Sequence, residues 1–155
     1  MKIYYILFMT LLFTSSIQAV TDISKDVEKQ IKSRMLELSK TMTKGGSGGK
    51  GYAQILMPNY TRWTVGSEII NNKSNWLKGI NDWFDSGWRV SESKNVILEI
   101  RIIKDLVFTR RIVTETYVGP KNEKNIYKTG VIETWIKQND NWFLLNASVT
   151  PTQLE

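Results

Sequence analysis

The sequence predicts an α+β domain in which helices from the first half of the chain cover an antiparallel sheet formed by the last third. Between residues 96 and 150, β-branched and aromatic residues recur in runs with a period near two, which is typical of strands. Two segments further upstream place apolar residues every three or four positions, as one-sided helices do. A chain of 155 residues is long enough for one domain with a buried core.

The first 19 residues have the three parts of a secretory signal. Met1 and Lys2 form a basic start, Ile3–Phe13 is apolar, and small residues lead to Ala19. We therefore expect cleavage after Ala19, a single domain over residues 20–155, and a secreted or periplasmic protein. The apolar run is short for a membrane span, so an uncleaved anchor is the lesser alternative and no stable membrane insertion is expected after cleavage.

The composition excludes several kinds of site. The chain has no cysteine and no histidine, so disulfides and metal sites of the Cys/His type are excluded, and we expect neither a metal nor a cofactor. The formal net charge of +6 comes from basic residues scattered among acids, without a long basic block. This pattern is typical of a solvated surface and predicts no nucleic-acid partner.

A long helix is predicted over Ile23–Met42, with Thr21 or Asp22 as its N-cap. Charged residues fall on the side opposite its apolar stripe, so the helix is expected to lie on the sheet. The apolar positions are Ile23, Val27, Ile31, Met35, Leu38 and Met42.

A glycine-rich stretch, Lys44–Gly51, follows this helix. It suggests a phosphate-binding loop, but only three residues separate Gly45 from Gly49, Lys50 is followed by glycine, and no predicted strand precedes it. We therefore interpret the stretch as a mobile linker.

Short elements are predicted next. Tyr52–Met57 can form one or two helical turns that end before Pro58, and Tyr60–Val65 can form a short strand. Gly66 then turns the chain.

A second amphipathic helix is predicted over Lys73–Ser86, with Asn72 or Ser74 as its N-cap. Tryptophans gather in and around it, which suggests either a platform for a cofactor or sugar, or a core stripe; the core is the more typical use of such rings. These tryptophans are Trp63, Trp76, Trp83 and Trp88.

Four strands are predicted to form an antiparallel meander closed by two tight turns, Lys104-Asp105 and Asn139-Asp140. A polar loop of seven residues, from Gly119 to Asn125, joins the middle two strands. The strands are Val96–Ile103, Leu106–Val118, Ile126–Gln138 and Trp142–Thr150.

In this register one row crosses the sheet through Leu98, Arg111, Glu133 and Asn146, and an even-numbered slip would keep these residues on the same face. Both faces are largely apolar, so helices can cover one while the other is left for self-association. The face of the row also carries Ile100, Val113, Glu115, Tyr117, Val131, Trp135, Trp142 and Leu144. The opposite face carries Phe108, Ile112, Ile132, Ile136, Phe143, Leu145 and Val149.

A resemblance to a known family rests on three stretches, Tyr52–Tyr60, Lys73–Ile80 and Asp140–Asn146, and on the order of the predicted elements. The chain resembles the nuclear transport factor 2-like (NTF2-like) superfamily, and within it the SnoaL-like, ketosteroid-isomerase-like branch. This resemblance implies a cone-like curved antiparallel sheet wrapped by helices, in the manner of a cystatin-like roll, with a pocket at its wide end. It also implies that the chain is a homodimer formed through the sheet.

Enzymes of this superfamily use a carboxylate base in the first-strand region, or a histidine and a carboxylate in the pocket. Here the corresponding stretch Arg62–Val65 has no acid, and Asn146 stands where many relatives carry histidine. Glu115 and Glu133 are then the candidate bases on the pocket face.

The leading functional hypothesis is a non-catalytic pocket for a small, largely apolar ligand with one polar or anionic group. The alternatives are a SnoaL-like or ketosteroid-isomerase-like lyase or isomerase that uses Glu133 or Glu115, and a homodimeric interaction module. The expected walls of the pocket are Tyr52, Trp63, Trp83, Tyr117 and Trp135.

At the floor of this pocket we expect a polar group formed by Arg111, Glu133 and Asn146, because a charge on an apolar face must be paired and hydrogen-bonded. Arg111 is the predicted ligand anchor, since its guanidinium can hold Glu133 and still offer donors to a ligand. The alternative is an ion pair that only holds the strands together.

Overall fold

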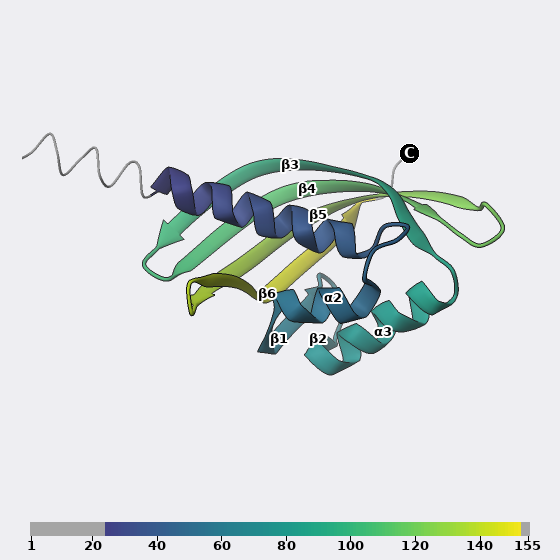
Figure 1. Cartoon of the computed structure of the whole chain (residues 1–155), viewed down its shortest axis with the longest axis horizontal. Helices are drawn as coiled ribbons and strands as arrows, with labels where there is room; N and C mark the ends of the chain where they lie inside the picture. Colours follow the sequence, from purple (N-terminus) through teal and green to yellow (C-terminus); the bar gives the residue numbers. More distant parts are fainter. Residues whose placement is uncertain (1–23, 153–155) are drawn as a thin grey trace, which may run out of the picture.

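The computed structural model describes residues 24–152, and it shows a curved, open sheet of six strands covered on one face by helices (Figure 1). The described helices are a long helix at residues 24–41, α2 (Gly48–Ile55) and α3 (Lys73–Asp85). The predicted α+β class is therefore confirmed. The expected signal segment, its cleavage site and the N-cap of the long helix lie outside the described residues. Within residues 24–152 no helix is both long and apolar enough to cross a membrane.

The strand order in the sheet is β2-β1-β6-β5-β4-β3. The predicted meander accounts for its last four strands, and both predicted two-residue turns are present. Lys104, Asn139 and Asp140 adopt the positive φ angles that such tight turns require. The strands are β1 (Leu56–Thr64), β2 (Ile70–Asn72), β3 (Arg89–Ile103), β4 (Leu106–Val118), β5 (Lys124–Gln138) and β6 (Asn141–Thr152).

The sheet is mixed, and not wholly antiparallel as predicted, because β1 pairs with β6 in parallel. Pro58 lies inside β1, where it was expected to end a helix. The pairing of β1 with β6 is irregular between Leu56 and Thr61, so the missing N–H of Pro58 breaks no regular ladder. The short edge strand β2 was not predicted, since its three residues are too few to show a period.

The glycine-rich stretch is not the predicted linker, because helix α2 begins within it at Gly48. Gly48 and Gly49 are buried against α3, and a Cβ atom on Gly49 would lie 2.0 Å from the Asn81 side-chain oxygen. A Cβ atom on Gly46 would lie 2.4 Å from the carbonyl oxygens of Lys40 and Thr41. The glycines therefore serve close approach between helices rather than flexibility.

A bulge in β3 changes the predicted register at its centre. Arg111 of β4 pairs with Ile97 and not with Leu98, and the pairing is interrupted between Ile97 and Glu99. Leu98 is consequently 64% exposed and lies outside the predicted row.

A second bulge lies in β6. Glu133 pairs with Ala147, and Thr134 pairs with Asn146, because the register shifts before Trp135. The bulge turns Asn146 away from the inner face and places Ala147 and Val149 on it, so the predicted faces of Asn146 and Val149 are wrong.

The middle hairpin is shifted as well, because its loop covers residues 119–123 and is shorter than the predicted seven residues. Arg111 therefore lies opposite Val131, and Glu133 lies opposite Thr109. This shift of two positions keeps Arg111 and Glu133 on one face, as the period of two requires.

The core lies between the long helix and the inner face of the sheet, the face expected to be covered. Trp142 is buried there, its indole N–H donates to Gln30 Oε1 at 2.9 Å, and its carbonyl accepts from Arg34 Nε at 2.9 Å. The long helix is thereby fixed across the sheet. The fully buried core side chains include Ile31, Ile55, Tyr60, Val107, Trp135 and Leu144.

Candidate functional site

A cavity of about 410 Å³ lies between the helices and the inner face of the sheet, beside the core. Its walls are mainly aliphatic and aromatic, and four charged residues also line it. The helices, and the turn directly after the long helix, contribute Leu38, Ser39, Met42, Tyr52, Trp76, Gly79, Ile80 and Trp83. The sheet contributes Arg62, Val90, Arg111, Val113, Glu115, Tyr117, Thr129, Val131, Glu133, Leu144, Ala147 and Val149.

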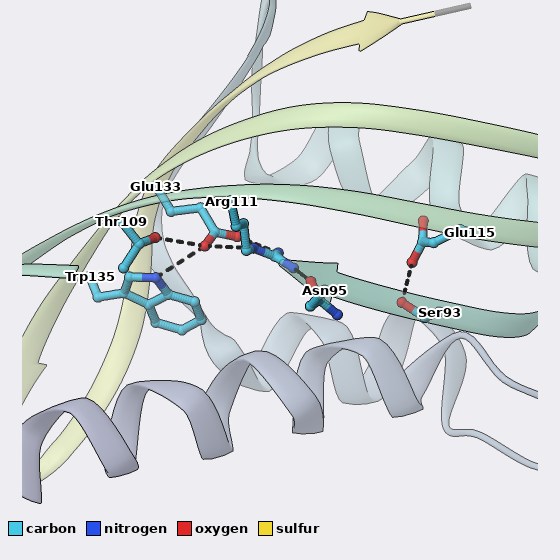
Figure 2. A network of polar contacts seen from close by, with 7 residues as sticks. All are labelled: Ser93, Asn95, Thr109, Arg111, Glu115, Glu133 and Trp135. Atoms are coloured by element: carbon cyan, nitrogen blue, oxygen red, sulfur yellow. Dashed lines mark hydrogen bonds and ion pairs between the residues drawn. The ribbon is translucent and has the colours of Figure 1, made fainter. Parts of the chain in front are cut away.

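Arg111 and Glu133 form a bidentate ion pair on adjacent strands (Figure 2). Arg111 Nε donates to Glu133 Oε2 at 3.1 Å, and an Nη of Arg111 donates to Glu133 Oε1 at 2.6 Å. The two side chains are 6% and 2% exposed, respectively. Two parallel charge-assisted bonds of this kind are strong and fix both side chains.

The carboxylate of Glu133 is surrounded by donors. Besides Arg111, the Thr109 hydroxyl donates to Oε2 at 3.0 Å, and the Trp135 indole N–H approaches the same oxygen at 3.4 Å. Figure 2 shows Thr109 and Trp135 on one side of the carboxylate and Arg111 on the other. Donors therefore occupy both carboxylate oxygens of Glu133, three of them on Oε2 and one on Oε1.

The remaining side of the Arg111 guanidinium is also engaged, because its other Nη donates to the Asn95 side-chain oxygen. Burial is the largest single effect and acts to lower the pKa of Arg111, but the charge and hydrogen bonds of Glu133, together with the charges of Tyr52 and Glu115, outweigh it, so the pKa is raised. Arg111 thus stays protonated, and its charge is neutralised by Glu133.

Glu115 lies further along β4, apart from this pair (Figure 2). The Tyr117 hydroxyl donates to Glu115 Oε2 at 2.9 Å, and the Ser93 hydroxyl approaches Oε1 at 3.5 Å. Burial, and then the charge of Glu115, raise the pKa of Tyr117, so its hydroxyl remains a donor at neutral pH. The Trp83 ring meets Tyr117 edge to face, with 5.4 Å between ring centroids.

An arginine that the sequence did not single out lies where β1 and α3 meet. Arg62 of β1 pairs in register with Ala147, a residue of the inner face. Its Cζ atom lies 4.0 Å from the centre of the Trp76 ring, so the guanidinium stacks on the indole.

Three buried side-chain polar atoms lack a hydrogen-bond partner within residues 24–152, and all three belong to this region. They are the Tyr60 hydroxyl oxygen, Arg62 Nε and Trp76 Nε1; we call Tyr60, Arg62 and Trp76 the Arg62 cluster. The sequence signal that could have revealed it is the strand period, which puts Arg62 on the same face as the buried Tyr60. Such atoms are rare, and each costs roughly 1–3 kcal/mol when it stays unsatisfied.

Tyr52 of α2 lies beside the Arg62 cluster, with its ring centroid 6.5 Å from that of Trp76. Burial raises the pKa of Tyr52, and the nearby Arg62 charge only partly offsets this effect. The hydroxyl is therefore a neutral donor at physiological pH.

The structure brings six of the predicted site residues to the cavity: Tyr52, Trp83, Arg111, Glu115, Tyr117 and Glu133. Three others do not line it. Trp63 is 36% exposed and donates to the Ser67 carbonyl at 2.8 Å, Trp135 is fully buried in the core, and Asn146 is on the other face. Trp63 is displaced because Arg62, its neighbour, takes the inward position of β1.

Among residues 24–152 there is no group of three or more acids that could hold a metal ion. The charged residues of the cavity are instead two arginines and two glutamates, which suit hydrogen bonding to an organic ligand.

No protein-family model matches the sequence, and a search of curated proteins found no match either. Solved structures do match in fold. A scytalone dehydratase candidate from Novosphingobium aromaticivorans aligns with a TM-score of 0.75 at 14% identity, over 86% of this chain and 89% of the other. An NTF2-like protein of unknown function from Prochlorococcus aligns with a TM-score of 0.65 at 9% identity, over 83% and 94%.

A ketosteroid isomerase-like protein from Erwinia carotovora atroseptica aligns with a TM-score of 0.62 at 9% identity, over 82% of this chain and 94% of the other. At these identities the likeness shows the fold and not the activity. It confirms the fold expected from the sequence resemblance.

Proposed function

We propose, from the premise that this chain has the NTF2-like fold, that its cavity binds a small, largely apolar ligand bearing one polar group and that it does so without catalysis. The observation that carries the proposal is the combination of a largely apolar cavity of about 410 Å³ with a deep acid, Glu133, that is already paired with Arg111 and hydrogen-bonded to Thr109. Ligand sites of this size are commonly apolar walls with a few placed polar groups.

Within residues 24–152 no further acid bonds to the Arg111–Glu133 pair, which supports the non-catalytic assignment. A general base must reach the proton it takes and must have a lone pair to receive it. Glu133 accepts from Thr109 and twice from Arg111, so proton transfer would require breaking a buried ion pair.

Proton transfer by Glu115 is the second candidate function. Glu115 lines the cavity and has one weak contact, with Ser93, on the oxygen that Tyr117 does not occupy. A lyase or isomerase of this kind would use Glu115 as base and the protonated Tyr117 as hydrogen-bond donor. In that case Glu115→Gln would abolish turnover but retain ligand binding.

Native mass spectrometry of gently purified protein tests the binding proposal. We expect a mass above that of the chain, with a small molecule released on denaturation. Ala147→Leu adds bulk at a cavity-lining position and should lower the bound fraction, whereas Ser33→Leu adds similar bulk on the exposed side of the long helix and should not. Equal loss in both variants, or no bound molecule in any preparation, would contradict the proposal.

A further inference from the structure

The charges of the cavity do not balance locally. Arg111 and Glu133 neutralise each other, and Glu115 is held by Tyr117 and Ser93. Arg62 makes no ion pair with any acid of the described range 24–152, and its Nε has no hydrogen-bond partner there. It is therefore the cavity-lining cation whose charge no described acid compensates at close range.

The position of Arg62 is nevertheless well defined. The guanidinium stacks on Trp76, and β1 is held between β2 and β6. Its Nε is fully buried, but the residue as a whole is only half-buried and lines the cavity, so the terminal nitrogens are the polar atoms of the side chain that can be open to that space. An arginine offers these terminal N–H groups in a planar fork that matches a carboxylate.

The Arg62 cluster also collects unused hydrogen-bonding groups. Neither the Trp76 indole N–H nor the Tyr60 hydroxyl makes a well-formed hydrogen bond within residues 24–152; the polar groups next to them are the Tyr52 hydroxyl beside Trp76 and Arg62 beside Tyr60. Buried donors of this kind are normally satisfied in a working protein. Arg62 and Trp76 both line the cavity, so an acceptor that enters it there would supply what the N–H groups of these two residues lack.

We propose that the Arg62 cluster is the anion-binding end of the cavity and that the ligand is a monocarboxylate with an apolar body. This inference rests on the proposed binding function, and it makes Arg62 rather than Arg111 the residue that anchors the ligand. The carboxylate accepts from the two terminal nitrogens of Arg62, and the apolar body lies against Val113, Val131 and Val149. A single uncompensated cation suits a monoanion.

Titration calorimetry with paired probes tests the inference. The probes are octanoate, decanoate and 2-naphthoate, each compared with the primary alcohol of the same skeleton, at neutral pH. We expect wild-type protein to bind at least one carboxylate about tenfold or more tightly than its alcohol, which is the gain typical of a charge-assisted hydrogen bond.

Arg62→Gln should remove this preference while leaving alcohol binding within about twofold, because the interaction that it removes is ionic. Arg62→Lys should retain part of the preference for carboxylates over alcohols, since the charge remains but the planar fork is absent. Trp76→Phe keeps an aromatic ring and removes the N–H, so it provides a second variant that should weaken carboxylate binding. Arg110→Gln is the matched control, because Arg110 is exposed and paired with Glu99 outside the cavity.

The outcomes separate the two proposals. Equal affinity for carboxylates and alcohols in wild-type protein, or an unchanged preference in Arg62→Gln, overturns the anion site and leaves the binding function standing. If no member of either series binds, the binding function fails and the anion site fails with it. Loss of the preference in Arg110→Gln as well would also overturn the assignment to Arg62.

Discussion

At the scale of single residues, the Arg111–Glu133 pair shows how this sheet holds two charges under a helix. The carboxylate receives two donors from arginine and one from the Thr109 hydroxyl, so neither charge is left without compensation. Removing one member would leave the other buried and unpaired, which is more damaging than removing both. The ion pair therefore stabilises the sheet whether or not the cavity holds a ligand.

This asymmetry gives a stability prediction. Arg111→Met should lower the free energy of unfolding by about 3 kcal/mol or more, because Glu133 stays buried without its partner. The double variant Arg111→Met with Glu133→Leu should recover most of that stability. Urea unfolding of the wild type and both variants measures the effect, and a double variant no more stable than the single one would contradict the scaffold role.

A second residue-scale prediction concerns alkaline pH. Burial raises the pKa values of Tyr52, Tyr60 and Tyr117 above that of a tyrosine in the unfolded chain, which is near 10. The unfolded state then loses its phenolic protons first, so the free energy of unfolding is undiminished below about pH 10 and falls as pH rises further.

Tyr117→Phe removes one of these groups and should make the decline with pH shallower, even though the variant starts from a lower stability. Urea unfolding between about pH 8 and pH 11 gives both slopes. Parallel slopes for variant and wild type would show that Tyr117 does not contribute.

The sequence predicted the correct face of the sheet for the residues whose face follows from the strand period alone. Arg111 and Glu133 share a face at any even register, so the shorter hairpin loop did not separate them. Asn146 was misplaced because one extra residue in β6 inverts every position after it, and nothing in the composition of that strand signals a bulge. Arg62 was missed because Trp63, the more apolar neighbour, was expected to face inward.

At the scale of elements, the glycine-rich stretch shows that composition alone does not decide between linker and packed helix. Gly46 lies against the carbonyl oxygens at the end of the long helix, and Gly48 adopts a positive φ at the start of α2. Which glycines are needed for contact depends on neighbours distant in sequence, such as α3, and these neighbours follow only from the tertiary structure.

Glycine substitutions test this assignment. Gly46→Ala should lower the free energy of unfolding by about 1–3 kcal/mol, because a Cβ atom would lie 2.4 Å from two backbone carbonyl oxygens that cannot rotate away. Gly79→Ala is the matched control within α3, where a Cβ atom meets nothing within 4 Å. It should leave stability unchanged or raise it by up to about 1 kcal/mol through helix propensity. If Gly46→Ala and Gly79→Ala changed thermal unfolding equally, the interpretation of Lys44–Gly51 as a mobile linker would be restored.

At the scale of the whole molecule, the outer face of the sheet carries exposed apolar side chains, and the described helices lie on the other side (Figure 1). Ile132 is 51% exposed and Phe108 is 37% exposed, on neighbouring strands of that face. Exposed apolar side chains on an uncovered sheet favour association, so we propose a homodimer formed through the sheet.

Light scattering coupled to size-exclusion chromatography tests the dimer. We expect twice the mass of one chain for wild-type protein and a monomer for Phe108→Lys with Ile132→Lys, since two charges on each facing surface would oppose association. Leu36→Lys changes an exposed apolar residue of the long helix, on the covered side of the sheet, and should remain dimeric. A wild-type monomer at high concentration would contradict the proposal.

The architecture itself was predictable because helix and strand periods persist over long segments, and the meander needs only short turns to define its order. The parallel pairing of β1 with β6 was not, because the two strands are far apart along the chain and no local signal selects a distant partner. Arg62 is the residue that β1 contributes to the cavity wall, so its position there depends on the pairing of β1 with β6.

A crystal structure with the tightest-binding carboxylate tests whether the cavity holds an apolar monocarboxylate at Arg62. We expect the carboxylate within hydrogen-bond distance of the terminal nitrogens of Arg62, the apolar body against the valines of the sheet, and the Arg111–Glu133 pair intact. A carboxylate bound to Arg111 with Glu133 displaced, or a ligand found outside the cavity at saturating concentration, would contradict it.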